Sequence, residues 1–242
     1  GEYGEGKMTD PKEIVNEINI YFNLLNKNKK YKALVTAGPT HEYIDPVRFI
    51  TNKSSGKQGF ALAKSLINKG FETTLITGPT NFEADNNINL IKVETADQMF
   101  KATQENLPVD VAIFSAAVSD FKSKKQINTK IKKQESISLN LEKNVDILNY
   151  VSNHNSLRPK LVIGFAAETN DLKKNAQKKL IEKNCDWIIA NDVSNKLIGF
   201  DSDFNEVSIF YKNKNINSEK LSMKKKSEIS DEIIDRVINH LN

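Results

Sequence analysis

The sequence is poor in the residues that build covalent or metal-held cross-links. It has one cysteine, Cys185, and three histidines, His41, His154 and His240, among 242 residues. A single cysteine excludes a disulfide within the chain and is typical of a reducing compartment. The histidines are scattered and share no metal-ligand spacing with Cys185, and no Ser-His-Asp arrangement can be argued from them. The fold must therefore depend on an ordinary hydrophobic core.

Long hydrophobic runs and a strong excess of charge are also absent. No apolar stretch approaches the ~18 residues of a membrane-spanning helix, and no signal peptide is visible. The 35 basic residues are interleaved with 31 acidic ones, which leaves a net charge of only +4. This balance favours a phosphate-rich small ligand over a nucleic-acid polymer, which we keep as an alternative. We expect a cytoplasmic protein that binds neither membranes nor nucleic acid.

The length and the hydrophobic content are those of a chain with one sizeable core. Hydrophobic residues make up 38% of the 242 residues, which is low but sufficient. Residues 1–10, GEYGEGKMTD, hold three of the ten glycines and no apolar periodicity. Such a composition predicts a flexible segment outside the main fold. We therefore expect residues 11–242 to form a single domain.

Apolar periodicity predicts strands that alternate with helices. A helix from Gly59 to Lys69 lies between two apolar runs, Ala33 to Ala37 and Glu72 to Thr77, and this order forms a β-α-β unit. Further strands are expected at Asn89 to Val93, Val109 to Ser115, Ile137 to Leu141, Leu161 to Ala166 and Trp187 to Ala190, with hairpin character over Phe200 to Tyr211. Further helices are expected at Pro11 to Leu25, Ala96 to Glu105, Val145 to Val151, Asp171 to Asn184 and Glu228 to Leu241. The prediction is an α/β, Rossmann-like fold with a mostly parallel sheet, and ligands bind such sheets at the carboxyl ends of the strands.

The longest polar loop follows the first predicted strand. Roughly twenty residues separate Gly38-Pro39-Thr40 from the apolar periodicity that resumes at Phe60, and loops of this length in a compact unit are usually functional or disordered. Small hydroxyls, a glycine and cations precede the helix, whose free N–H groups attract anions. This loop is not a standard phosphate loop, because Gln58 stands where Ser or Thr is needed, and it lacks a dinucleotide fingerprint. An anion site is one interpretation, and a plain loop with a helix cap is the other.

Two charged features further along the chain also fit an anionic ligand. Asp120 follows a buried strand and could bind ribose hydroxyls or a divalent ion, although a turn aspartate is an equal alternative. The segment from Lys122 to Lys133 has six lysines and no acidic residue. We interpret this segment as a flap that closes over phosphates, and a solvated charged loop is the alternative. Lys179 and Lys183 share a helix face and could reach the same anion, but in isolation they fit solvated surface charge.

Seven motifs together carry a resemblance to a known family. They are VTAGPTHEYIDPVRFITNKSSGKQGFALA, SAAVSDF, KIKK, KNVDIL, GFAAETND, ANDVS and GFDSDFNEV, in this order. The chain resembles the phosphopantothenoylcysteine synthetase family of coenzyme A biosynthesis. Its start, GEYGEGKMTDPKEI, resembles the junction that joins this synthetase to a flavin-dependent decarboxylase in bifunctional bacterial proteins. The resemblance implies that residues 1–10 are a remnant of that junction, that the full-length protein is fused to the decarboxylase, and that this chain binds no flavin.

The resemblance also implies the reaction. A ligase unrelated to the ATP-grasp enzymes would use CTP and Mg²⁺ to convert the carboxylate of 4′-phosphopantothenate into an acyl-cytidylate, with release of pyrophosphate. The amine of L-cysteine would then displace the nucleotide. A homodimer is implied as well, formed through the Phe200 to Tyr211 hairpin and the flap. ATP is the nucleotide of eukaryotic relatives, and an NAD(P)-dependent Rossmann oxidoreductase is the alternative function.

The family's functional positions can be carried onto this chain residue by residue. Its catalytic positions match Arg48, Asn52 and Lys130, and Asn52 would donate its amide N–H to the reacting carbonyl. Its nucleotide-contacting positions match Ser54, Ser55, Gly56, Phe114, Ser115, Ala116, Asp120, Lys130, Val145, Asp146, Ile147, Leu148, Phe165, Lys179 and Lys183. The metal ligands are not identified by this comparison.

Three positions depart from the family pattern. Ser119 replaces a common alanine, Gln58 replaces a frequent methionine, and Val145 replaces the proline of a KNPDI motif. None of them removes a side chain to which the resemblance assigns chemistry. The reaction is therefore expected to be retained, whereas the details of the base pocket are less well defined.

Overall fold

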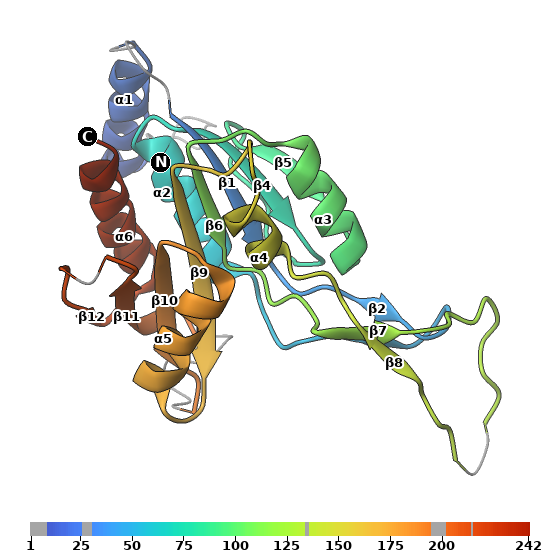
Figure 1. Ribbon diagram of the computed structural model, residues 1–242. Helices are drawn as coiled ribbons and strands as arrows, with labels where there is room; N and C mark the ends of the chain where they lie inside the picture. Colours follow the sequence, from blue (N-terminus) through green and yellow to red (C-terminus); the bar gives the residue numbers. More distant parts are fainter. Residues whose placement is uncertain (1–8, 26–30, 134–135, 195–201, 214) are drawn as a thin grey trace, which may run out of the picture.

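An eight-stranded sheet forms the centre of the molecule. The computed structural model describes residues 9–25, 31–133, 136–194, 202–213 and 215–242 (Figure 1). The sheet has the order β12-β11-β10-β9-β6-β1-β4-β5. Its strands are Lys32–Ala37 (β1), Glu72–Thr77 (β4), Asn89–Lys92 (β5), Val111–Phe114 (β6), Leu161–Glu168 (β9), Trp187–Asp192 (β10), Phe204–Tyr211 (β11) and Glu219–Lys225 (β12). The strands from β10 to β5 in this order pair in parallel, and β11 and β12 add an antiparallel hairpin.

Helices cover both faces of the sheet. They are Pro11–Leu25 (α1), Lys57–Asn68 (α2), Ala96–Glu105 (α3), Ile147–Ser152 (α4), Leu172–Lys183 (α5) and Lys226–Leu241 (α6). One hydrophobic cluster joins α2 and α6 to one face, and a second joins α3, α4 and α5 to the other. Figure 1 shows α1 beside α2 and α6 at one side of the molecule. No helix in the described part of the chain is long and apolar enough to cross a bilayer.

Local sequence explains why these elements form. The inner strands β1, β6 and β10 are built around apolar runs, such as Ala33 to Val35 in β1 and Trp187 to Ala190 in β10, because helices cover both of their faces. α3 begins at a capping box, in which Gln98 N–H donates to Thr95 Oγ1 at 3.2 Å and Gln98 Oε1 accepts the N–H of Thr95 at 3.3 Å. The predicted α/β class with a mostly parallel sheet is confirmed.

An arm of short strands projects from the carboxyl ends of β1 and β6. It consists of two antiparallel pairs, Glu42–Tyr43 (β2) with Phe49–Ile50 (β3), and Phe121–Ser123 (β7) with Leu141–Lys143 (β8). In Figure 1 the connection between β7 and β8 extends furthest from the sheet. The described part of this connection carries the lysines of the flap.

Several sequence predictions of secondary structure were wrong in detail. Residues 136–140 form no strand, and β8 begins only at Leu141, because nothing in the described chain covers the apolar side chains there. Phe204–Tyr211 forms one continuous strand, and its hairpin partner is β12, which the sequence analysis missed. The last helix begins at Lys226, two residues earlier than predicted. Residues 1–8 and 195–201, on which other predictions rested, lie outside the described residues.

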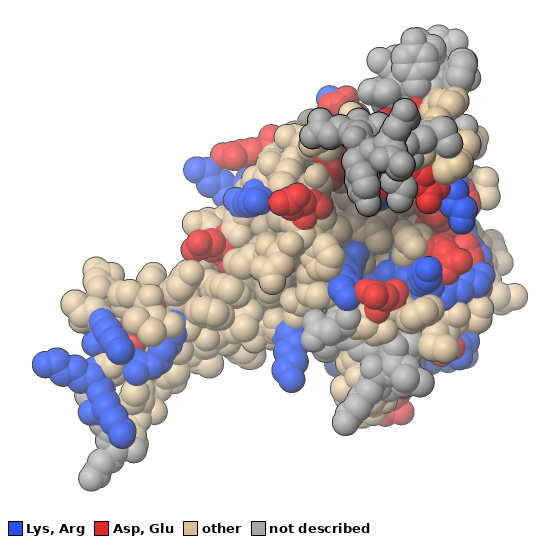
Figure 2. All heavy atoms as spheres, turned by 180° about the vertical axis from the view of Figure 1, so that it is seen from behind, with Lys and Arg blue, Asp and Glu red and all other residues tan. Residues whose placement is uncertain are grey.

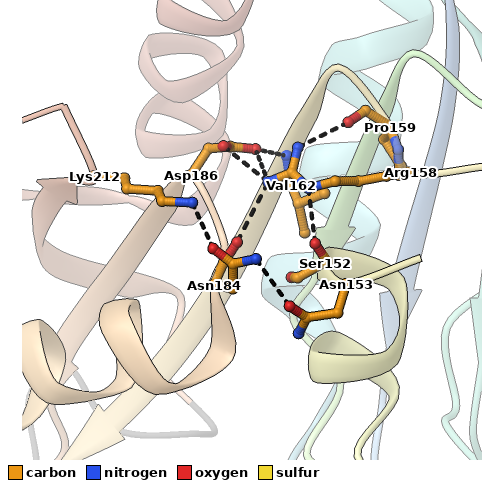
Figure 3. A network of polar contacts seen from close by, with 8 residues as sticks. All are labelled: Ser152, Asn153, Arg158, Pro159, Val162, Asn184, Asp186 and Lys212. Carbon is orange, nitrogen blue, oxygen red and sulfur yellow. Dashed lines mark hydrogen bonds and ion pairs between the residues drawn. The ribbon is translucent and has the colours of Figure 1, made fainter. Parts of the chain in front are cut away.

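A polar network lies at the amino ends of β9 and β10, at the other end of the strands from the arm (Figure 3). The Arg158 guanidinium donates to both carboxylate oxygens of Asp186 at 2.9 and 3.0 Å. Its Nε donates to the carbonyl oxygen of Ser152 at the end of α4, at 2.8 Å. Asp186 also accepts the N–H of Val162 at 2.8 Å. The network therefore ties α4 to the two strands beside it.

Candidate functional site

The first turn of α2 lies tightly against the carboxyl end of β1. A Cβ added to Gly59 would lie 2.4 Å from Ala37 Cβ and 2.8 Å from Ser115 Oγ, so only glycine permits this approach. Gly56, before α2, has a φ of 79°, a conformation that favours glycine. The N–H of Gly56 donates to Ser54 Oγ at 3.2 Å. The predicted anion surface, Ser54 to Gly56, thus lies at a helix N-terminus beside the strand ends.

The turn after β6 runs alongside the residues that follow β1. Ser115 Oγ donates to the carbonyl oxygen of Thr36 at 2.7 Å, and the N–H of Ala117 donates to the carbonyl oxygen of Gly38 at 2.9 Å. Asn52 Nδ2 donates to the carbonyl oxygen of Val118 at 3.0 Å. The structure therefore brings Asn52 into contact with the turn that ends in the exposed Asp120.

Asp45 is a buried carboxylate that sequence reasoning missed. Its side chain is 0% exposed, and Oδ1 accepts the N–H groups of Val47 and Arg48, both at 2.8 Å. Oδ2 accepts Arg48 Nη1 at 2.7 Å and the N–H of Ile131 at 3.1 Å. Asp45-Pro46 is a turn-initiating pair, which was the signal available in the sequence.

The environment of Asp45 favours its charged form. Burial by itself would raise the pKa of Asp45, but the N–H groups of Ile131, Val47 and Arg48 and the charge of Arg48 lower the pKa to about 2. The pKa of Asp45 is lower in the folded state than in the unfolded chain. The stability that Asp45 contributes is therefore fully present at pH values above the pKa of an unfolded aspartate. It is lost as the pH falls through about 2.

The flap crosses the loop that carries Arg48. The N–H of Ile127 donates to the carbonyl oxygen of Ile44 at 3.0 Å, and Arg48 Nη1 donates to the carbonyl oxygen of Ile131 at 3.2 Å. Lys130 is exposed between these two attachment points. Figure 2 shows Lys and Arg side chains gathered at the end of the arm.

One flap lysine differs from the others. Lys122 Nζ donates to Asp97 Oδ2 at 2.6 Å, and this hydrogen bond raises the pKa of Lys122. Asp97 lies in the first turn of α3, so Lys122 fastens the base of the flap to the body of the protein. We therefore assign Lys122 a structural contact and leave the anion-binding prediction with the lysines nearer Lys130.

Many predicted nucleotide-binding residues line the face of the sheet that α3, α4 and α5 cover. Phe114, Ala116, Val145, Ile147 and Leu148 belong to the hydrophobic cluster on that face. The side chain of Asp146 caps α4 by accepting the N–H of Asn149 at 2.9 Å, and it also forms an ion pair with Lys183. Chain segments from three separate parts of the sequence thus meet here.

Other predicted residues are placed apart. The side chain of Phe165 packs against the hydrophobic cluster of α2 and α6, on the opposite face from Val145 and Leu148, because alternate residues of β9 point to opposite faces. Lys179 contacts Glu168 at 2.9 Å, whereas Lys183 contacts Asp146. The two lysines therefore lie against different carboxylates rather than converging on one point.

Two departures from the family pattern have structural partners. Gln58 Nε2 donates to Ser230 Oγ at 2.9 Å, and Gln58 Oε1 accepts Asn205 Nδ2 at 2.9 Å, which links α2 to α6 and β11. Ser119 is buried, and its Oγ donates to the carbonyl oxygen of Phe121 at 2.8 Å. Val145 packs within the second cluster. Gln58 thus links three elements through hydrogen bonds, whereas Ser119 stabilises the turn that leads into β7.

The described residues contain no group of three His, Cys, Asp or Glu side chains that could hold a metal ion. Cys185 is buried, and burial raises the pKa of its thiol to about 12, which fits the interpretation as a small core residue. Mg²⁺ commonly binds one or two carboxylates together with substrate phosphates. The exposed Asp120 beside the strand ends fits that arrangement.

Known proteins resemble this chain in sequence and in fold. A family model described as the DNA/pantothenate metabolism flavoprotein C-terminal domain matches residues 28–241. A coenzyme A biosynthesis bifunctional protein CoaBC from Haemophilus influenzae is 39% identical over 240 residues, which are 98% of this chain and 59% of that protein. The chain therefore spans about three fifths of the length of such curated relatives.

Solved structures extend the comparison. The C-terminal domain of a coenzyme A biosynthesis bifunctional protein CoaBC is 36% identical, with a TM-score of 0.72 over 87% of this chain and 95% of that one. A Cab2 mutant in complex with phosphopantothenate-cysteine is 17% identical, with a TM-score of 0.69 over 98% of this chain and 96% of that one. The second likeness is one of fold alone.

Proposed function

Because the chain belongs to the family of DNA/pantothenate metabolism flavoprotein C-terminal domains, we propose that it is a phosphopantothenate–cysteine ligase of coenzyme A biosynthesis. It joins 4′-phosphopantothenate and L-cysteine through an acyl-cytidylate formed from CTP. The similarity to bifunctional proteins of coenzyme A biosynthesis supports this proposal. The phosphopantothenate-cysteine bound by the Cab2 structure is the product that the reaction would give.

The observation that carries the proposal is that the long loop contacts both of the other segments. Asn52 contacts the turn after β6 through Val118, and Arg48 contacts the flap through Ile131. The long loop thus links the flap to the strand ends, where α/β folds bind ligands. A bare loop with a helix cap would not require these contacts.

The residues act on two chemical steps. In the first, a carboxylate oxygen of 4′-phosphopantothenate bonds to the α-phosphorus of CTP, and the bond to pyrophosphate breaks. Lys130 places positive charge where negative charge gathers on the phosphates. In the second step the cysteine amine bonds to the carbonyl carbon, the amine loses a proton, and CMP leaves.

Asn52 is oriented for the carbonyl. Its amide has two N–H donors, and one of them is used by the carbonyl oxygen of Val118. This bond fixes the plane of the amide, so the second N–H is held in a defined direction for the oxygen of the acyl group. The exposed Asp120 would be a carboxylate available to hold Mg²⁺, which would supply positive charge against the phosphates.

A homodimer is part of the proposal. The arm exposes several large apolar side chains, each at least 40% exposed: Val47, Phe49, Phe121, Ile137, Leu139 and Leu141. Large apolar side chains that are exposed together on one part of a surface are typical of protein interaction sites. They favour the flap region over the β11–β12 hairpin as the face that a second copy covers.

Other functions have less support. An NAD(P)-dependent oxidoreductase on the same fold would need a glycine fingerprint after β1, where the chain has only Gly38. A nucleic-acid-binding module would use the flap lysines, but acidic residues are interleaved with basic ones along most of the chain. Absence of NADH binding in a fluorescence titration would dismiss the first of these.

The first prediction concerns the half-reaction that precedes cysteine. With 4′-phosphopantothenate and Mg²⁺ but without cysteine, the protein should release pyrophosphate with CTP and more slowly with ATP, GTP or UTP. Released pyrophosphate can be followed with a coupled phosphate assay, with omission of 4′-phosphopantothenate as the control. No release with any nucleotide would contradict the mechanism, and a preference for ATP would contradict the CTP assignment.

The second prediction concerns Asn52→Asp. The carboxylate cannot donate to the Val118 carbonyl oxygen or to the acyl group, so the yield of ligated product per pyrophosphate released should fall by about 10²-fold. Quench-flow measurement of both products would detect this. Asn89→Asp, on the edge strand β5, is the control that should keep the wild-type ratio. Wild-type kinetics of Asn52→Asp in both half-reactions would show that its role is misassigned.

A further inference from the structure

Asp45 connects the two segments that carry the proposed catalytic residues. It lies in the long loop, three residues before Arg48, and it accepts the N–H of Ile131, which directly follows Lys130 in the flap. The two partners are 86 positions apart in sequence. Because this fully buried carboxylate joins two segments that are far apart in sequence, it constrains how the loop and the flap lie relative to each other.

The contacts enclose a very short part of the flap. On one side, the N–H of Ile127 donates to the carbonyl oxygen of Ile44, next to Asp45. On the other side, Ile131 is held through both of its backbone groups, the N–H by Asp45 and the carbonyl oxygen by Arg48. Only residues 128–130 lie between these attachment points, so the backbone at Lys130 has little freedom to move.

Each carboxylate oxygen of Asp45 accepts two hydrogen bonds. Two backbone N–H groups of its own turn occupy Oδ1, and the Arg48 guanidinium and the flap N–H share Oδ2. The guanidinium of Arg48 is therefore directed by Asp45 while its Nη1 also reaches the flap. Arg48 and Lys130 are thus positioned by one common group.

We propose that Asp45 is a positioning residue of the ligase, which holds the flap so that Lys130 has a fixed reach to the reacting phosphates and which directs Arg48. The catalytic part of this inference rests on the proposed function. The attachment of the flap is a property of the protein without substrates, and it can be tested separately.

Glu42 provides a matched control. It is also buried, at 3% exposure, and it lies in β2 of the same arm. Its carboxylate accepts the N–H of Ala96 at 2.9 Å, at the start of α3, and its influence on the flap is a charge interaction with Lys122 at the base, away from the attachment points at Ile127 and Ile131. Glu42→Gln therefore removes a buried charge of the same loop without releasing Lys130.

The first test uses the protein without ligands. In Asp45→Asn, the amide has one acceptor oxygen and a donor group in place of the second, so the N–H of Ile131 or those of the local turn lose their acceptor. Limited trypsin digestion should cut the flap after its lysines about tenfold faster than in the wild type. Glu42→Gln should be cut at the wild-type rate. Equal cleavage of both variants would overturn the proposal.

The second test separates positioning from general destabilisation. Asp45→Asn should lower pyrophosphate release by about 10- to 100-fold, whereas in a Lys130→Gln background its further effect should be several-fold smaller, because the part of the loss that acts through Lys130 is already gone and only the part through Arg48 remains. Full additivity of the two losses would overturn the positioning role. If Asp45→Asn does not fold, Ile131→Pro removes the same hydrogen bond from the flap side and should give the same non-additivity. If the wild type releases no pyrophosphate, the proposed function fails, and the trypsin result still decides whether Asp45 holds the flap.

Discussion

Lys130→Gln should reduce CTP-dependent pyrophosphate release by about 10²–10³-fold, the usual effect of removing one preorganised electrostatic group. Glutamine keeps most of the length of lysine but lacks its positive charge, which we propose to act on the triphosphate. The backbone at Lys130 is held between Ile127 and Ile131, so the lost charge is not readily replaced by a neighbouring lysine.

Lys125→Gln is the matched control for this prediction. Lys125 belongs to the same flap and is also exposed, but it lies before the attachment at Ile127. Its replacement should change the rate by less than about threefold, because mobile surface charges are screened by salt. The rates should be measured at saturating and limiting CTP to separate binding from turnover. Equal losses in the two variants would favour the interpretation of the flap as a merely charged loop.

The second large effect is expected on stability. Arg158→Met should lower the free energy of unfolding by about 3 kcal/mol, because it leaves the Asp186 carboxylate without the Nη2 group that donates to both of its oxygens (Figure 3). The carbonyl oxygens of Ser152 and Asn184 also lose a donor. The arginine side chain is 28% exposed, so the loss should lie at the lower end of values for buried pairs.

Thermal unfolding should report this loss as a fall of about 6–12 °C in Tm for a chain of this size. Lys160→Met is the control, because the nearby pair of Lys160 and Asp110 is 57% and 23% exposed and should matter much less. Equal shifts in the two variants would contradict the role assigned to Arg158. Since Arg158 also holds the end of α4, a larger KM for CTP in Arg158→Met would fit the predicted nucleotide contacts of that helix.

The sequence predicted the segments that carry the candidate site, but not the contacts between them. The quoted motifs place Asn52, Asp120 and Lys130 in three segments, and in the structure the long loop contacts the turn after β6 and the flap. The sequence analysis did not identify Asp45 as the group that joins two of them. The predicted roles of these residues remain to be tested by the variants described above.

The sequence by itself determined the alternation of strands and helices, the parallel order that follows from it, and the family. These properties are local, because apolar periodicity and turn residues report which face of a short segment is buried. Only the tertiary structure decided that Asp45 meets Ile131, that Arg158 meets Asp186, that β12 completes the sheet, and that Phe165 faces away from α4. The physical reason is that such contacts depend on where distant segments lie after folding. The residues next to Asp45 in sequence do not indicate that its carboxylate accepts an N–H group 86 positions away.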